Sequence, residues 1–384
     1  MQVVAWGTFD VGKPRVRIAL RGLRENGVSV YECHADVWAG VEDKSQLFGF
    51  LPKIRKLGQW LLSYPKLIWC YLKAPRHDVV LVPYMGHLDV LVLWPFAKLR
   101  GANVVWDAFL SLYNTIVEDR RIIASKNPLA WLIYAFEWLA TRAADCVVLD
   151  TAAHADYFAR RYSLSEDKLA YVHVGVESER CPLLRSLEPK VPNKPLTVLF
   201  YGQFIPLHGI PTIIEAARQL DDGSVHWVLI GQGQEEASIR ASLELDPIKN
   251  IEWRSWVPYE ELIGLIGLSD ICLGVFGESE KAGRVIPNKV FQVIAAGRPL
   301  VTRDGPGIRE LLADTEPGLK LVPPADSSAL VAALSQMISA RDSFVGVDLF
   351  EEAREKISCS SIGMQWVGCI SVAAKGSLKR RRWH

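Results

Sequence analysis

A cluster of polar residues in the second half of the chain has the chemistry to bind an anion. Its members are Arg284, Asn288, Lys289 and Gln292. Pro287 suits the first turn of a helix, where its missing N–H would have no partner, and Gly297 suits a left-handed helix exit. The spacing therefore predicts a helix over about 287–296, with Lys289 and Gln292 on its polar face.

A helix start of this kind is a potential phosphate site. Its free N–H groups and its dipole favour an anion, and Lys289 in the first turn adds a full positive charge. The alternative is a solvated surface lysine on a helix that begins near a loop. This segment alone supports both interpretations equally.

Two further strand-to-helix junctions strengthen the phosphate hypothesis, because each places glycine directly after a strand, where backbone can approach a ligand closely. They read "FYGQFIPLHGI" and "LIGQGQEE". We expect the donor-binding residues of these loops and of the polar helix to be Gly202, Gln203, His208, Gly231, Gln232, Gly233, Trp256, Pro287, Asn288 and Gln292.

Short β-branched and aromatic runs alternate with longer helix-period segments along most of the chain, which is typical of βαβ units in parallel sheets. A Pro- and Lys-rich break at 188–195 interrupts the alternation. We therefore predict an α/β protein with two doubly wound, Rossmann-like domains, over 1–190 and 191–362. The tail, 363–384, is expected to fold back as a helix toward the first domain. A ligand cleft between the two domains is the default expectation.

The segments "LFYGQFIPLHGIPTIIEAARQL", "VLIGQG", "SDICLGVFG" and "IPNKVFQVIAAGRPLVTRDGPGIREL" resemble the C-terminal half of the retaining GT-B glycosyltransferases of family 4, the glycosyl transferases group 1. The resemblance covers nearly the whole second half in order and spacing. It implies transfer of a sugar, with retained anomeric configuration, from a nucleotide-diphosphate donor to an acceptor held mainly by the first domain. The acceptor class is a glycan or lipid-linked glycan, as in cell-surface polysaccharide or glycolipid synthesis. No cofactor is implied besides the nucleotide sugar itself.

The chain departs from the family pattern at four positions. Where the family has an arginine and a lysine for the diphosphate, this chain has Gln203 and His208, and where the family has two glutamates it has Arg284 and Gln292. An amide can still bond ribose hydroxyls. We expect Arg284 and Lys289 to supply the missing positive charge and to act in catalysis on the departing diphosphate, with no metal ion.

Acceptor-binding residues are expected in the first domain, at two loops that follow strands. They are Gly7, Thr8, Asp10, Lys13, Tyr113, Asp119 and Arg120. Asp107 is a further catalytic candidate, as the nearest substitute for a histidine that members of the resembling family often place in this region. It is expected to bind an acceptor hydroxyl, and the alternative is that it only caps a turn. His87 is expected to begin a helix and His173 to pack at the domain junction, neither with a catalytic role.

Composition limits the class of protein. Acidic and basic residues nearly cancel, 43 against 44, so no nucleic-acid partner is indicated. Seven cysteines without CxxC pairs or metal-like spacing indicate reduced thiols and a cytoplasmic protein, and the N-terminal segment does not have the pattern of a signal peptide.

The stretch 48–76 mixes tryptophans and leucines with lysines and arginines. This composition suits a helix lying in an anionic membrane surface, which would place the protein at the inner face of the membrane. A helix that simply covers a sheet is the alternative.

Two other functions share the expected fold. A nucleotide-sugar-binding scaffold that has lost catalysis would explain the missing carboxylates. A sugar-nucleotide epimerase should show carboxylates and a histidine in the cleft, which the sequence does not indicate.

Overall fold

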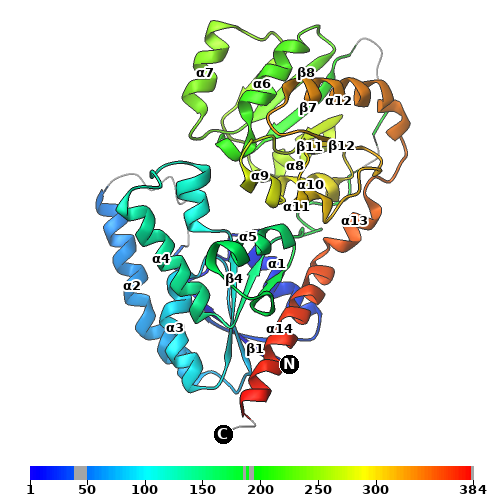
Figure 1. Cartoon of the computed structure of the whole chain (residues 1–384). Helices are drawn as coiled ribbons and strands as arrows, with labels where there is room; N and C mark the ends of the chain where they lie inside the picture. The colour runs from blue at the N-terminus through cyan, green and yellow to red at the C-terminus, as the bar shows by residue number, and fades with distance from the viewer. Residues whose placement is uncertain (39–49, 185–186, 190–193, 382–384) are drawn as a thin grey trace. The chain divides into compact units, whose positions relative to one another are not determined.

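The computed structural model describes residues 1–38, 50–184, 187–189 and 194–381, with backbone only for 50–54 and 376–381. Two compact units result, Met1–Gly175 together with the segment from Ser358 onward, and Val176–Ile357. Figure 1 shows a parallel sheet flanked by helices in each unit. The predicted cleft depends on the relative placement of the units and stays a prediction.

The first unit contains a six-stranded parallel sheet in the order β2-β1-β3-β4-β5-β6. Its strands are β1 (Gln2–Gly7), β2 (Ser29–His34), β3 (Val79–Val82), β4 (Asn103–Phe109), β5 (Cys146–Leu149) and β6 (Leu169–Tyr171). The central strands are buried along their length, as expected for runs rich in valine that are covered on both faces.

Helices cover both faces of this sheet. They are α1 (Pro14–Glu25), α2 (Phe50–Lys73), α3 (His87–Leu99), the π-helix η2 (Asn114–Asp119), α4 (Pro128–Ala143), α5 (Ala152–Tyr162), the 3-10 turn η3 (Glu166–Lys168) and α14 (Cys359–Arg381). One face packs on α2, α3, α4 and α5, and the other on α1 and α14. Side chains of Asn127 and Thr151 cap the starts of α4 and α5.

The second unit repeats the architecture, with strand order β12-β11-β10-β7-β8-β9. Its strands are β7 (Leu196–Tyr201), β8 (Val225–Ile230), β9 (Ile251–Arg254), β10 (Ile271–Leu273), β11 (Leu300–Arg303) and β12 (Leu319–Val322). Its helical segments are η4 (Pro206–His208), α6 (Ile210–Gln219), α7 (Glu236–Leu245), α8 (Tyr259–Leu268), α9 (Glu280–Arg284), α10 (Asn288–Ala296), α11 (Pro306–Arg309), α12 (Ser327–Ala340), η5 (Arg341–Phe344) and α13 (Glu351–Lys356). The predicted α/β class with two doubly wound sheets is confirmed.

The units divide earlier in the chain than predicted. Val176 N–H donates to Ile357 O (3.0 Å), and Arg341 pairs with Asp270 (2.8 Å) and with the backbone carbonyl of Glu188. The stretch after Gly175 therefore packs with the second unit, although it precedes the Pro-rich break.

The C-terminal segment joins the first unit as helix α14. Asn103 Nδ2 donates to Ala373 O (2.6 Å), and Ile362 and Trp366 pack in the same core as α1. Residues 382–384 of the predicted tail lie outside the described residues. Among the described helices, none combines the length and the apolar character needed to cross a membrane.

The predicted polar helix is present as α10. It starts one residue later than expected, because Pro287 has extended backbone angles and serves as the N-cap residue. Gly297 takes the expected left-handed conformation (φ 64°) at the C-terminus.

Candidate functional site

The carboxyl ends of β7 and β10 mark the point where the strand order of the second sheet reverses. From β7 the chain proceeds through β8 to β9 on one side, and from β10 through β11 to β12 on the other. Open α/β sheets bind ligands in the crevice at such a point. The loop that follows β7 and helix α10, which follows β10 and α9, meet here.

Gly202, directly after β7, brings the chain backbone against Lys289 of α10. A Cβ atom at Gly202 would lie 2.9 Å from Lys289 Nζ and 3.0 Å from His208 Cε1. Its φ of 140° is also one that residues with side chains rarely adopt. Glycine is therefore required both by conformation and by the closeness of the lysine.

The second glycine loop packs on the first. A Cβ atom at Gly231 would lie 1.9 Å from Gly202 O, and one at Gly233 would lie 2.7 Å from Phe204 O. Phe204 N–H donates to Gln232 O (2.9 Å). This packing explains both glycines without a ligand, so their contribution to a site is to hold the Gly202 loop in place.

The side-chain nitrogen of Lys289 is buried. Only 5% of the residue is exposed, its Nζ lies 3.7 Å from the centroid of the Phe200 ring, and Nζ has no hydrogen-bond acceptor among the described residues. Burial lowers the pKa of Lys289 well below its ordinary value. An anion brought to this nitrogen would restore the charge and satisfy its donors.

Two tyrosines position the polar face of α10. The Tyr201 hydroxyl lies 3.2 Å from Lys289 O and 3.0 Å from Gln292 Oε1, and Gln292 Nε2 lies 3.5 Å from the Tyr259 hydroxyl. The Gln292 amide is thus oriented from both ends. Neither tyrosine was predicted. Tyr201 could have been noticed as the last residue of a strand that leads into a glycine loop.

The start of α10 keeps its anion-binding character. Pro287 has no side-chain acceptor, so the N-cap residue leaves the first-turn N–H groups uncapped, and Asn288 is exposed at the first helical position. The helix N-terminus and the buried lysine therefore lie in the same turn.

Arg284 ends α9 as a buried residue, and its Nη1 donates to the exposed Glu280 Oε2 at 2.7 Å. The guanidinium is therefore already paired in part within its own helix. Its predicted partnership with Lys289 at a diphosphate stays a prediction.

Three other residues predicted to bind the donor lie in loops of the second unit. Gln203 is exposed, and its carbonyl oxygen accepts a hydrogen bond from His208 Nδ1, which fixes the imidazole against the loop. Trp256 is exposed in the loop after β9.

In the first unit, the loop after β1 is tied into the protein interior. Thr8 N–H donates to Asp89 Oδ2 (2.9 Å), and Tyr64 donates to Asp89 Oδ1 (2.6 Å). A Cβ atom at Gly7 would lie 2.5 Å from Asp89 Oδ2. Gly7 and Thr8 thus have a structural explanation that needs no acceptor.

The nearby Asp10 and Lys13 form a local ion pair. Asp10 Oδ2 lies 3.9 Å from Lys13 Nζ, and Asp10 Oδ1 accepts from Gly12 N–H at 2.9 Å. The carboxylate shapes the turn before α1, and its expected contact with an acceptor stays a prediction.

Asp107 has a structural partner that the sequence did not indicate. Arg15 Nε lies 2.8 and 2.9 Å from the two carboxylate oxygens, and both residues are buried. Arg15 also donates to the carbonyl oxygens of Val172 and Leu149. Both oxygens of Asp107 are engaged, which argues against the predicted contact with an acceptor hydroxyl or with reacting atoms.

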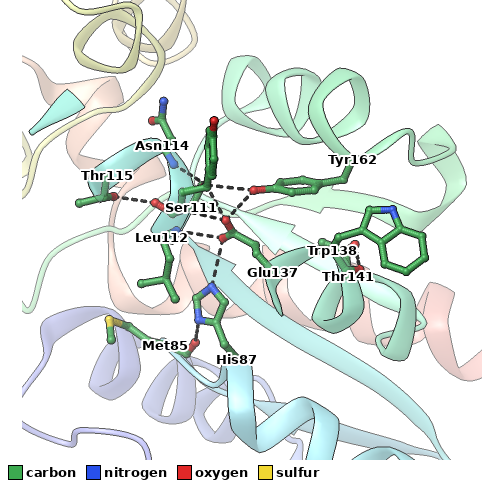
Figure 2. A network of polar contacts seen from close by, with 11 residues as sticks. Met85, His87, Ser111, Leu112, Asn114, Thr115, Glu137, Trp138, Thr141 and Tyr162 are labelled. Atoms are coloured by element: carbon green, nitrogen blue, oxygen red, sulfur yellow. Dashed lines mark hydrogen bonds and ion pairs between the residues drawn. The ribbon is translucent and has the colours of Figure 1, made fainter. Parts of the chain in front are cut away.

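Glu137, in α4, is the centre of a buried polar network (Figure 2) that sequence reasoning missed. Its carboxylate accepts from Ser111 Oγ (2.7 Å), Leu112 N–H (2.9 Å), Tyr113 N–H (3.1 Å) and the Tyr162 hydroxyl (2.5 Å). Burial works to raise the pKa of Glu137, but its bonds, that to His87 foremost, leave it below the ordinary value.

This network gives roles to two residues considered earlier. His87 begins α3, as predicted, and its Nε2 lies 3.1 Å from Glu137 Oε1. Tyr113 is held through its backbone, and the Arg161 guanidinium lies over its ring, 4.3 Å from the centroid. A single acid in a largely apolar helix was the available signal.

Asp119 is buried at the end of η2, and the half-buried Arg120 follows it. Their predicted role toward an acceptor stays a prediction. In the part of the chain that the structure describes, no group of three or more His, Cys, Asp or Glu side chains is arranged to hold a metal ion.

Comparisons with known proteins bear on both units. Residues 195–340 match the model of the family "Glycosyl transferases group 1". The chain is 26% identical over 150 residues to the "Putative colanic acid biosynthesis glycosyl transferase WcaI" of Escherichia coli K12, and 26% identical over 196 residues to the amylovoran biosynthesis glycosyltransferase AmsK of Erwinia amylovora. These matches cover 38% and 49% of this chain, and 37% and 46% of those proteins, so they span less than half of either relative.

Among solved structures, Anabaena Alr3699/HepE in complex with UDP is similar over 97% of this chain and 100% of its own, with a TM-score of 0.66 and 12% identity. The same protein has been crystallised with UDP-glucose.

The fold is the two-domain α/β fold of GT-B glycosyltransferases. The stretch that matches the Glycosyl transferases group 1 model, 195–340, lies within the second unit.

Proposed function

We propose that this protein is a retaining glycosyltransferase. It moves a sugar from a nucleotide-diphosphate donor to a glycan or lipid-linked glycan, in the synthesis of a cell-surface polysaccharide or glycolipid. The group 1 domain and the names of the two bacterial relatives support the activity class. The HepE complexes with UDP and UDP-glucose support a nucleotide sugar as donor.

The observation that carries the proposal is the buried, unpaired Lys289 at the reversal point of the second sheet. A buried ammonium group without a counter-charge is unfavourable, and folding normally avoids it. It becomes favourable when a phosphate group lies between Lys289, the Gly202 loop and the uncapped start of α10. The diphosphate of the donor is the group that this arrangement fits.

In the proposed reaction the bond between the anomeric carbon and the diphosphate breaks, and the negative charge on the leaving group increases. Cations aimed at that charge stabilise the transition state more than the ground state. Lys289 supplies one, and Arg284 supplies a second if it exchanges Glu280 for phosphate. We propose that these protein cations act without a metal ion or further cofactor.

Gln292 is proposed to bond the ribose hydroxyls. Its amide carries both donor and acceptor capacity, and Tyr201 and Tyr259 fix its orientation. The acceptor is proposed to bind the first unit, and the cytoplasm is the proposed location.

A non-catalytic nucleotide-sugar-binding protein is the second candidate. It is favoured by Arg284 and Gln292, which occupy positions where the resembling family has carboxylates. The two candidates share the donor site and differ in turnover.

Calorimetric titration with UDP tests the shared site. Lys289→Ala and Arg284→Ala should each weaken binding by roughly 1.5 to 3 kcal/mol, the value of a hydrogen bond to a charged group. Unchanged affinity in both variants would remove the proposed phosphate site. A thermal-shift screen of sugar nucleotides then identifies the donor, because specific binding raises the unfolding temperature.

Turnover separates the candidates. With the identified donor and a lipid extract as acceptor, a transferase releases free nucleotide diphosphate, whereas a binding protein leaves the donor intact. Lys289→Ala provides the background rate for this assay.

A further inference from the structure

Helices α2, α3 and α4 lie side by side on one face of the first unit's sheet (Figure 1), with α3 in contact with both neighbours. Their inner faces form one core with the sheet. Tyr64 and Leu67 of α2, Leu93 of α3 and Ala140 of α4 are all buried in it. The inner faces of these helices therefore cover this face of the sheet.

The outer faces of the same helices are also apolar. Exposed large apolar residues recur on them at helical spacing, at Leu57, Leu61, Leu62, Trp69 and Leu72 of α2, Trp94 and Leu99 of α3, and Leu129, Trp131, Leu132, Trp138 and Leu139 of α4. Leu62 is 78% exposed, Leu99 80% and Trp131 67%. So many exposed large apolar side chains on three neighbouring helices mark an interaction surface rather than ordinary scatter.

The charges on these helices have one sign. Helix α2 contains no Asp or Glu in its sequence. Helices α3 and α4 contain one acid each, Asp89 and Glu137, and both are buried in hydrogen-bond networks. Among the described residues of the three helices, the exposed charges are all basic, and they are Arg55, Lys66, Lys73 and Arg142.

Two of these cations are paired with tryptophans in the same geometry on α2 and α4. Lys73 Nζ lies 4.3 Å from the ring centroid of Trp69, and the Arg142 guanidinium lies 4.8 Å from that of Trp138. Each cation follows its tryptophan by four residues, so each pair occupies one turn of the outer face. Tryptophan beside a long cationic side chain is the combination favoured at the boundary between lipid headgroups and acyl chains.

We propose that the outer faces of α2, α3 and α4 form a docking surface for an anionic lipid bilayer. Leucine and tryptophan side chains insert among the acyl chains near the headgroups, while the lysines and arginines contact lipid phosphates. This inference goes beyond the proposed function, because it requires no donor or acceptor site.

A lipid surface fits better than a protein partner because of the charge pattern. Protein interfaces combine apolar contacts with charges and hydrogen bonds arranged for one partner. Here a leucine- and tryptophan-rich face has exposed charges of basic residues only. Such a face is complementary to a bilayer, whose acyl chains are apolar and whose anionic headgroups are negative. The sequence indicated only 48–76, of which 48 and 49 lie outside the described residues, whereas the structure adds α3 and α4.

Co-sedimentation with vesicles tests the surface without substrate. The full-length protein should bind vesicles of phosphatidylcholine with about one third phosphatidylglycerol, and bind neutral phosphatidylcholine vesicles at least about tenfold more weakly, since each basic residue adds to attraction by anionic lipid. High salt should reduce binding to the anionic vesicles.

Double variants on α2 and on α4 test whether binding needs one helix or the whole surface. Leu62→Ser/Trp69→Ser on α2 and Trp131→Ser/Leu132→Ser on α4 should each weaken vesicle binding about tenfold or more. The matched control, Leu245→Ser/Leu268→Ser, alters two leucines of the second unit that are even more exposed, and it should leave binding unchanged. Because all six residues are exposed, the fold should be retained, and circular dichroism checks it.

Three results would overturn the proposal. Equal binding to neutral and anionic vesicles would exclude an anionic bilayer as the partner. Loss of binding in the α2 variant alone, with the α4 variant like wild type, would reduce the surface to a single helix. A lipid-free dimer that the α4 variant converts to monomer, without vesicle binding by wild type, would identify a second copy of the chain as the occupant. The UDP affinity of the same variants should be unchanged. Failure of the proposed lipid surface can therefore be distinguished from failure of the proposed donor site.

Discussion

The Lys289 side-chain nitrogen lies 3.7 Å from the centroid of the Phe200 ring, next to the glycine that follows strand β7. A π-face offers some attraction to a cation, but it cannot accept the three hydrogen bonds that an ammonium group can donate. The pair therefore holds Lys289 in place while leaving its donors available. This combination of fixed position and unmet hydrogen bonding is what a preformed phosphate site requires.

Lys289→Met should stabilise the ligand-free protein while weakening UDP binding. Because burial lowers the pKa of Lys289 in the folded state, the unfolded chain binds the extra proton at neutral pH and folding is penalised. The penalty shrinks as pH rises toward the unfolded pKa. The unfolding midpoint of the variant should therefore exceed that of wild type by about 2 °C or more near pH 7, and by less near pH 10. Lys356→Met, at an exposed lysine, serves as control.

UDP binding should take up protons at about pH 8, since an adjacent anion raises the lowered pKa of Lys289. Titration calorimetry in two buffers of different ionisation enthalpy measures this uptake. The effect should disappear in a variant that still binds but lacks the amine, such as Lys289→Gln. Zero uptake by wild type would mean that Lys289 is already charged in the empty protein.

Gly202→Ala should reduce UDP affinity more than it reduces stability. The new methyl group would meet Lys289 Nζ at 2.9 Å and His208 at 3.0 Å, so it must displace the lysine. Gly223→Ala is the matched control, because it also has positive φ but meets only Asn250 Nδ2, at 3.9 Å. Both variants should lose about 1 kcal/mol or more of folding free energy from backbone strain. Equal UDP affinity in the two variants would contradict the proposed approach of donor to Gly202.

Glu137→Gln should destabilise the first unit by about 3 kcal/mol or more, because the new amide N–H₂ would face the N–H and O–H groups that now donate to the carboxylate. Denaturant unfolding measures the loss. The pKa of Glu137 is lowered in the folded state, so its contribution to stability is present above the unfolded value and is lost as pH falls through the folded value. The exposed Glu166→Gln should show neither effect. A Glu137→Gln variant as stable as wild type would show that the network is dispensable.

Asp107→Asn distinguishes a structural from a catalytic aspartate. If its role is the buried pair with Arg15, stability should fall by about 3 kcal/mol, with transferase activity lost only in proportion to the unfolded fraction. Activity measured alongside urea unfolding makes the comparison. A stable variant with a greatly reduced rate would instead restore the catalytic role.

The sequence alone determined the architecture of each unit. Alternating β-branched runs and helix-period segments specify strands and helices locally, so a doubly wound parallel sheet was predicted in each half of the chain. Pro287 and Gly297 likewise placed the ends of α10 to within a residue, because they act through backbone geometry. Lys289 and Gln292 were singled out because helical spacing fixes which residues share a face.

Only the tertiary structure decided which polar residues are paired with one another in the protein interior. Arg15 and Asp107 are 92 positions apart, and Glu137 collects donors from three other segments, so no local pattern could pair them. The outer apolar face formed by α2, α3 and α4 has the same origin, since burial of one side of a helix depends on what the fold packs against it. Local chemistry is encoded along the chain, whereas partnership and exposure arise only when distant segments come together.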